Sequence, residues 1–307
     1  MPRPAAPNAP SPTMTYSHLT RRESLVTLAA GAASIAGLNR AAQAADTPAT
    51  LPAMPATSSF RHSVCKWCYP NIPLETLATA GKDLGLSSIE LLDPAEWPTV
   101  QKYGLTCAVA NGTTTITSGL NRIENHAKMV PSMIERIQAC AGAGLPNVIC
   151  FSGNRGGMPD EQGLENCALA LKLIAAAGEK AGVTVVMELL NSKVNHHDYM
   201  CDHTTWGVDL VKRVGSERFK LLYDIYHMQI MEGDIIRTIQ DHHASIAHYH
   251  TGGNPGRHEI DATQELNYPA IMRAIKATGF TGFVAQEFLP THDALTSLRE
   301  AVQMCSV

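Results

Sequence analysis

The sequence has few charged or aromatic side chains, and several features that would mark a protein class are missing. Only 17% of its 307 residues are charged and 6% are aromatic, whereas 45% are hydrophobic. This composition excludes a disordered chain, and no repeat of solenoid length is visible. No basic cluster occurs, and a net charge of −4 argues against a nucleic-acid-binding protein. The length suits one large domain or two small ones.

The apolar run near the N-terminus is too short to span a bilayer, which requires about 20 apolar residues. It extends over Val26–Leu38, is rich in Ala and Gly, and follows the pair Arg21-Arg22. After it comes Ala42-Gln43-Ala44, a small-x-small cleavage pattern. Together these features are typical of a Tat export signal. An ordinary N-terminal helix and a membrane anchor are the alternatives.

Three segments follow from this interpretation. Residues 1–44 are predicted to be the signal peptide, and 45–59, rich in Pro, Ala, Thr and Ser, a flexible linker. Residues 60–307 are predicted to form the folded domain. The first 44 residues hold four basic side chains and one acidic one, so their removal changes the net charge from −4 to −7. We expect an acidic bacterial protein that works in the periplasm.

Short β-rich runs alternate with helical patterns throughout the folded part. The predicted strands are 62–66, 88–91, 105–110, 147–151, 184–189, 220–223, 245–250 and 282–287. The predicted helices are 74–84, 123–143, 161–181, 205–214, 233–242, 268–278 and 294–303, with a weakly helical connection at 96–103. Eight such units predict an α/β fold, a (β/α)₈ TIM barrel. The alternative, a doubly wound sheet, requires a glycine-rich loop after the first strand, and none occurs.

Four ionisable side chains end four successive predicted strands: Glu188, Asp224, His250 and Glu287. In a TIM barrel these positions converge on one mouth. Three carboxylates in a small space require a counter-charge, and a divalent cation supplies it. Carboxylate oxygens and one imidazole suit Mn²⁺, Mg²⁺ or Zn²⁺. Alternatively, each residue has a separate Lys or Arg partner from a neighbouring loop.

Further polar residues follow these strands. His227 is expected on the loop that leaves the strand ending at Asp224. There it would donate a hydrogen bond to a substrate oxygen, or else serve as a capping or packing histidine with no part in the reaction. Arg257, in the turn-rich loop after His250, would grip a carboxylate or form a surface salt bridge. His248 is expected to face away from the cation.

The runs Asp224-Ile225-Tyr226-His227-Met228-Gln229 and Asn254-Pro255-Gly256-Arg257-His258-Glu259, and Glu188 followed by Asn191, resemble the hydroxypyruvate isomerase family. That family belongs to the xylose-isomerase-like barrels, which include ketose 3-epimerases. The resemblance implies a cation held by Glu188, Asp224, His250 and Glu287, the two glutamates moving protons, and substrate contacts from His227 and Arg257. Two positions depart from the pattern. His250 stands where the isomerases tend to carry Gln, and Leu289 where a basic residue is common.

The expected function is a metal-dependent isomerase that interconverts a small 2-keto/hydroxy acid or sugar through an enediolate. Mn²⁺ or Mg²⁺ is favoured over Zn²⁺. The alternatives are a ketose 3-epimerase, a sugar dehydratase or lyase, and an exported carbohydrate-binding protein. The expected partners are the small keto acid or sugar, the Tat translocon during export and, as an option, further copies of the chain in a homo-oligomer. Nucleic acid is not expected.

The eight cysteines form no evident disulfide framework. Cys65-Lys66-Trp67-Cys68 resembles a redox motif or half of a zinc site, but the sequence has no second CxxC.

Overall fold

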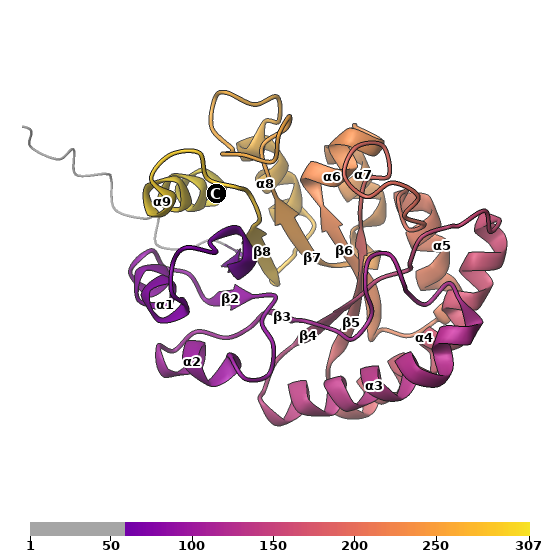
Figure 1. Ribbon diagram of the computed structural model, residues 1–307. Helices are drawn as coiled ribbons and strands as arrows, with labels where there is room; N and C mark the ends of the chain where they lie inside the picture. The colour runs from indigo at the N-terminus through magenta and orange to yellow at the C-terminus, as the bar shows by residue number, and fades with distance from the viewer. Residues whose placement is uncertain (1–58) are drawn as a thin grey trace, which may run out of the picture. The chain divides into compact units, whose positions relative to one another are not determined.

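A computed structural model describes residues 59–307, which form a nearly closed barrel of eight parallel strands surrounded by helices (Figure 1). The strands are β1 (Arg61–Cys65), β2 (Ser88–Glu90), β3 (Val109–Ala110), β4 (Asn147–Cys150), β5 (Thr184–Leu189), β6 (Phe219–Asp224), β7 (Ile246–Thr251) and β8 (Phe283–Gln286). Their order is β2-β1-β8-β7-β6-β5-β4-β3. Isolated parallel bridges, Ser88 to Thr106 and Leu92 to Ala110, join the two edges. The predicted TIM barrel is confirmed.

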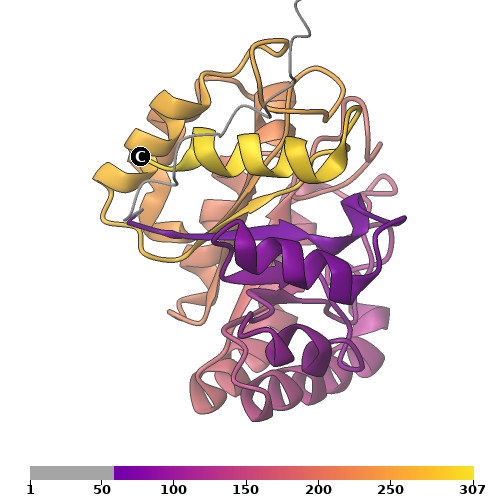
Figure 2. The same ribbon diagram turned by 90° about the vertical axis from the view of Figure 1, so that its left-hand side faces the viewer.

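The helices follow the predicted alternation, and Figure 2 shows them covering the outside of the strands. They are α1 (Leu74–Asp83), α2 (Trp97–Lys102), α3 (Ile123–Gly142), α4 (Asp160–Ala181), α5 (Thr204–Val214), α6 (Ile225–Met231), α7 (Ile235–His242), α8 (Tyr268–Ala277) and α9 (Ala294–Cys305). Short 3-10 turns occupy Lys66–Cys68 and His243–Ser245. The predicted signal at 1–44 and nearly all of the predicted linker lie outside the described residues. Within 59–307, no helix is both long and apolar enough to cross a membrane.

One helix was missed by the sequence patterns. Asp224 ends β6, and its carboxylate accepts a hydrogen bond of 3.1 Å from the backbone N–H of His227, which caps α6. The helix spans only Ile225–Met231, too short for a clear helical periodicity. His227 therefore lies in the first turn of a helix. The expectation that it lies on a loop is wrong.

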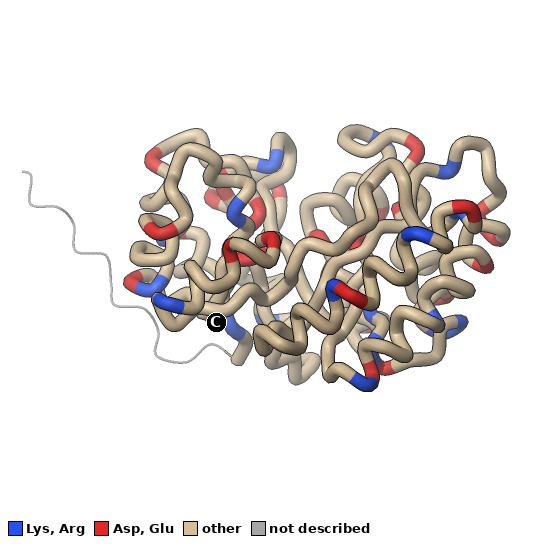
Figure 3. The backbone as a smooth tube through the Cα atoms, turned by 60° about the horizontal axis from the view of Figure 1, so that its bottom comes forward, with Lys and Arg blue, Asp and Glu red and all other residues tan. Residues whose placement is uncertain are grey.

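The core has two parts. Inside the barrel, Val109, Ile149, Val186 and Leu222 form a small apolar cluster. A much larger cluster fills the space between the strands and the helices. Acidic and basic residues are interspersed along the chain in the view of Figure 3. The inner cluster closes the barrel below the strand ends, so polar chemistry is confined to the mouth.

The loop between β3 and α3 lies very close to β4. A Cβ atom on Gly112 would be 1.9 Å from the backbone oxygen of Ile149, and one on Gly119 would be 2.4 Å from the backbone oxygen of Phe151. The backbone N–H of Leu120 donates to Phe151 O at 3.2 Å, and that of Asn121 donates to Ser152 O at 2.8 Å. The absence of side chains at the two glycines lets this loop lie against the barrel mouth.

Gly112→Ala is expected to lower the free energy of unfolding by about 2 kcal/mol or more, because backbone atoms must shift to admit the methyl group. Gly142→Ala is the matched control. A Cβ at Gly142, the last residue of α3, meets nothing within 4 Å, so Gly142→Ala should stabilise by at most about 0.5 kcal/mol. Urea denaturation of both variants measures the difference, and effects of the same sign would contradict the close approach at Gly112.

Candidate active site

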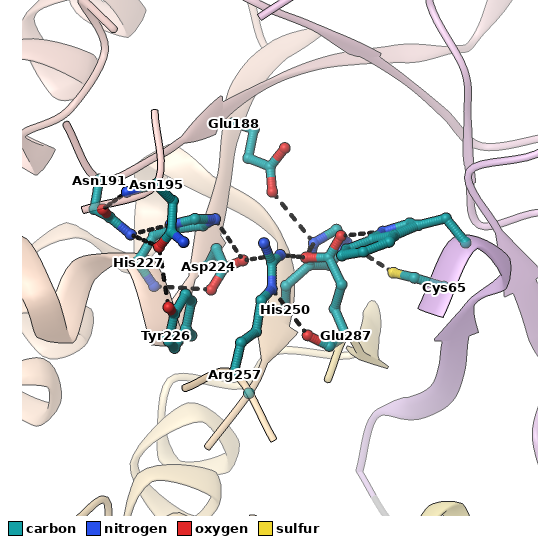
Figure 4. A network of polar contacts seen from close by, with 12 residues as sticks. Cys65, Glu188, Asn191, Asn195, Asp224, Tyr226, His227, His250, Arg257 and Glu287 are labelled. Atoms are coloured by element: carbon teal, nitrogen blue, oxygen red, sulfur yellow. Dashed lines mark hydrogen bonds and ion pairs between the residues drawn. The ribbon is translucent and has the colours of Figure 1, made fainter. Parts of the chain in front are cut away.

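The structure brings together the four side chains that the strand ends predicted (Figure 4). Glu188 lies in β5, Asp224 ends β6, His250 lies in β7, and Glu287 directly follows β8. Each is at most 5% exposed. One ligand atom from each lies within 4.8 Å of the others. These distances are compatible with shared coordination of a single cation.

Arg257 provides a positive charge inside this cluster. Its Nη2 donates to Asp224 Oδ2 at 3.1 Å and to Glu287 Oε2 at 2.5 Å, and its Nε donates to the backbone oxygen of Glu287 at 3.2 Å. The guanidinium carbon lies 5.1 Å from the Trp67 ring centroid and 5.3 Å from that of Tyr226. The side chain is 11% exposed, so these are buried ion pairs and not a surface salt bridge.

Arg257 and the imidazole of His250, whose pKa values are both raised, only partly neutralise the three carboxylates. Burial raises the pKa of Asp224 to about 8 and Arg257 lowers it only in part, while Glu287 and Glu188 raise it further. Burial also raises the pKa of Glu188. For Glu287, burial is outweighed by Arg257 and His250, so the pKa of its carboxyl is well below the usual range. Two of the three acids therefore hold their protons more tightly than usual, which indicates room for a further positive charge.

The orientation of His250 suits a cation ligand. Its Nε2 donates to Glu90 Oε1 at 2.8 Å. Burial lowers the pKa of this imidazole, but Cys65, Glu287 and Glu188 together raise it well above its usual value, so a cation bound at Nδ1 would replace a proton there. Its Nδ1 faces the carboxylates, 2.7 Å from Glu287 Oε2 and 3.4 Å from Glu188 Oε1. An acidic partner on the far nitrogen is the usual arrangement of a metal-ligating histidine. The donor chemistry and the orientation of the ring therefore fit a divalent cation.

His227 presents a hydrogen-bond donor to the same region. The side-chain amide of Asn191 donates to its Nδ1 at 2.6 Å, so we assign the ring proton to Nε2. Among residues 59–307 that Nε2 has no hydrogen-bond partner, and it lies 3.6 Å from Asp224 Oδ2. Burial lowers the pKa of His227 well below its usual value, and Arg257 adds to this effect. A neutral imidazole with a free buried N–H is suited to donate to a substrate oxygen.

Glu90 is a site residue that the sequence reasoning missed. It ends β2, is fully buried, and its Oε1 lies 2.8 Å from Nε2 of both His248 and His250. The expectation that His248 faces away is wrong, because side chains two residues apart lie on the same face of a strand. Glu90 is an ionisable side chain at the end of a strand. The same criterion identified the four residues at the ends of the last four strands, and it would have identified Glu90 had it been applied to β2.

Trp67 was also missed. Its indole N–H donates to Glu287 Oε1 at 2.7 Å, although the residue is 43% exposed. It belongs to the Cys65–Cys68 motif, whose two cysteines are both buried and unpaired. Burial raises the pKa of both thiols, so they are protonated at neutral pH. Within the described residues, this motif therefore positions a carboxylate and forms no disulfide.

A cavity of about 300 Å³ opens onto this cluster. Glu188, Glu287 and Arg257 line it on the side of the last four strands, together with His196 from the loop after β5. Burial lowers the pKa of His196, with a further contribution from Arg257. A small molecule in this cavity would reach both glutamates and the guanidinium.

Known proteins share this architecture. The chain is 35% identical over 127 residues to a 2-oxo-tetronate isomerase of Cupriavidus necator, an alignment that covers 41% of this chain and 46% of the relative. It is 34% identical over 114 residues to the hydroxypyruvate isomerase of Escherichia coli, covering 36% and 44%. A crystal structure titled AP endonuclease, family 2, from Brucella melitensis matches with a TM-score of 0.70 and 22% identity, over 78% of this chain and 96% of that one. At that identity the structural match concerns the fold.

A family model described as "Xylose isomerase-like TIM barrel" matches residues 97–305. The matched segment starts at α2 and includes β3 to β8, so it contains Glu188, Asp224, His250 and Glu287. The chain belongs to the xylose isomerase-like TIM barrel family.

Proposed function

We propose that this isomerase moves a proton between adjacent carbons of a small 2-keto/hydroxy acid or sugar. The observation that carries the proposal is the convergence of Glu188, Asp224, His250 and Glu287, whose ligand atoms lie within 4.8 Å of one another. Relatives named hydroxypyruvate isomerase and 2-oxo-tetronate isomerase support the reaction class. An arrangement of this kind suits removal of a proton next to a carbonyl.

A divalent cation would be held by the carboxylates of Glu188, Asp224 and Glu287 and by Nδ1 of His250. When bound, it would supply positive charge that stabilises negative charge on a substrate oxygen. Mn²⁺ and Mg²⁺ fit the oxygen-rich donor set better than Zn²⁺. Glu90 would fix the ring of His250 in the required orientation.

The two glutamates differ in their freedom to carry a proton. Both carboxylate oxygens of Glu287 accept hydrogen bonds, Oε1 from Trp67 and Oε2 from Arg257. Among the described residues, the carboxylate of Glu188 has only the longer contact of 3.4 Å with His250, and it lines the cavity. We therefore assign the first proton abstraction to Glu188, because the less restrained carboxylate, which lines the cavity, is better able to move to the substrate proton. Glu287, or Glu188 itself, returns the proton to the neighbouring carbon.

Arg257 and His227 would orient the substrate. The buried guanidinium would attract the carboxylate of a keto acid or the hydroxyls of a sugar. The free Nε2–H of His227 would donate to an oxygen near Asp224. Neither side chain needs to change protonation during the reaction, because the pKa of Arg257 is raised and that of His227 lowered.

Exchange of the substrate α-proton with solvent deuterium tests the reaction. With Mn²⁺ present, hydroxypyruvate or a ketose should exchange, and a chelator should abolish the exchange. Glu188→Gln is expected to lower kcat by about 10² to 10⁴, because the base is lost. Glu265→Gln, at an exposed position outside the cavity, is the control. Absence of exchange across a panel of hydroxyketones, with tight binding retained, would instead indicate a carbohydrate-binding protein.

Cation binding is expected to depend on pH. Below the pKa of about 8 the carboxyl of Asp224 is protonated, so binding must release a proton. Mn²⁺ affinity should therefore rise from pH 6 to pH 8, by up to about tenfold per pH unit for each proton released. Calorimetry in two buffers of different ionisation enthalpy measures the proton count. Equal affinities at the two pH values would contradict the raised pKa.

We also propose that residues 1–44 direct Tat export and that the enzyme works in the periplasm. In a bacterium with a Tat translocon, changing both Arg21 and Arg22 to Lys should retain the protein in the cytoplasm. Arg40→Lys, outside the twin pair, should leave export unchanged. Immunoblots of periplasmic and cytoplasmic fractions measure the distribution, and export of the double variant would contradict this route.

A further inference from the structure

The cavity has two chemically different sides. All the charged lining residues, Glu188, Arg257 and Glu287, lie on the side of the last four strands, where Leu190 and Trp67 also line the cavity. The other side consists largely of carbon and is formed by Leu91, Ile116, Ile149 and Phe151, which we call the apolar wall. Asn111, which directly follows β3, also lines the cavity and carries a side-chain amide. A ligand that reaches both sides meets charge at one end and hydrocarbon at the other.

The apolar wall is built from rigid parts of the fold. Ile149 is a residue of β4, is 2% exposed and belongs to the apolar cluster inside the barrel, against which Leu91 and Phe151 pack. Ile116 comes from the loop that lies against β4 through Gly112 and Gly119. These side chains are held in place before any ligand binds, so they select a ligand by shape and polarity.

The backbone next to the wall has its hydrogen bonds satisfied by protein. The N–H of Phe151 donates to the hydroxyl of Thr114 at 2.8 Å, and its C=O accepts from the N–H of Leu120 at 3.2 Å. These groups are already paired, so they offer little to the hydroxyls of a ligand. A hydroxyl placed against this wall loses water without gaining a partner, which is unfavourable.

The cavity also exceeds the needs of a three-carbon keto acid. Its volume of about 300 Å³ corresponds to about ten molecules of liquid water. If the reacting carbons lie at Glu188 and Glu287, the remaining space lies against the apolar wall. Each methylene placed there should improve binding by about fourfold.

We propose that the substrate is a 2-keto/hydroxy compound with an apolar group attached beside its reacting carbons. This inference rests on the proposed function and narrows its substrate class. The charged end of the molecule lies at Arg257 and the two glutamates, and the hydrocarbon end lies against Ile116 and Phe151. Asn111 remains available for one polar atom of the substituent.

Two substrates of matched length test the proposal. One is 3-hydroxy-2-oxopentanoate, with an apolar tail, and the other is 3,4-dihydroxy-2-oxobutanoate, with a polar tail. Deuterium exchange at C3, followed by NMR with Mn²⁺ present, gives kcat/KM for each. We expect the apolar-tailed substrate to be preferred at least tenfold.

Ile116→Thr keeps the β-branched shape of the wall and adds a hydroxyl. It should reduce the preference several-fold, mainly through KM of the apolar-tailed substrate. Ile123→Thr makes the same change at a side chain that is 53% exposed and outside the cavity, and it should leave the preference unchanged. If the wall served only to exclude water, Ile116→Thr would slow both substrates equally, and the proposal would be wrong.

Failure of this proposal differs from failure of the proposed function. Exchange with equal or greater efficiency on the polar-tailed substrate would overturn the apolar substrate and leave the isomerase intact. Exchange with neither substrate would count against the isomerase. In that case calorimetric binding of the same two compounds still tests the wall, and equal affinities would overturn its role in recognition.

Discussion

Three carboxylates buried at the mouth of one barrel impose the main electrostatic constraint on this structure. Asp224, Glu188 and Glu287 cannot all ionise there without positive charge nearby. Arg257 and His250 supply part of it and hold Glu287 ionised, while the raised pKa of Asp224 indicates that the balance is incomplete. The excess of buried negative charge makes the cluster unfavourable without a cation, and it favours the binding of a divalent cation. The cation binding, proton transfer and substrate orientation that we propose would therefore all depend on one charge arrangement.

The barrel fixes this arrangement through its strands. Residues at the ends of β5 to β8 are held by a parallel ladder, so their side chains converge without help from long loops. Arg257 and His227 then enter from segments that directly follow β7 and β6. Rigid strands provide the ionisable groups, and the short segments after them provide the two groups that we propose contact substrate.

Much of this arrangement could be predicted from the sequence because it depends on local patterns. An acid or histidine that ends an apolar strand is visible in a single sequence, and the four strand-end residues were found in this way. Helix α6 was not, because seven residues carry little periodicity and its cap is the same Asp224 that faces the cluster. The apolar wall could not be predicted from the sequence either. It depends on the close approach of Gly112 and Gly119 to β4, a contact between segments far apart in sequence.

Glu90 has a consequence for how this barrel can be divided. It lies on β2, yet its carboxylate accepts from two histidines of β7, and β1 and β8 lie between these strands. An eight-stranded barrel can be divided into two halves of four consecutive strands each. Here the half that carries the apolar wall also supplies the anion that orients a histidine of the other half. A transplanted first half would keep His250 in its present orientation only if it also carried an acid at this position.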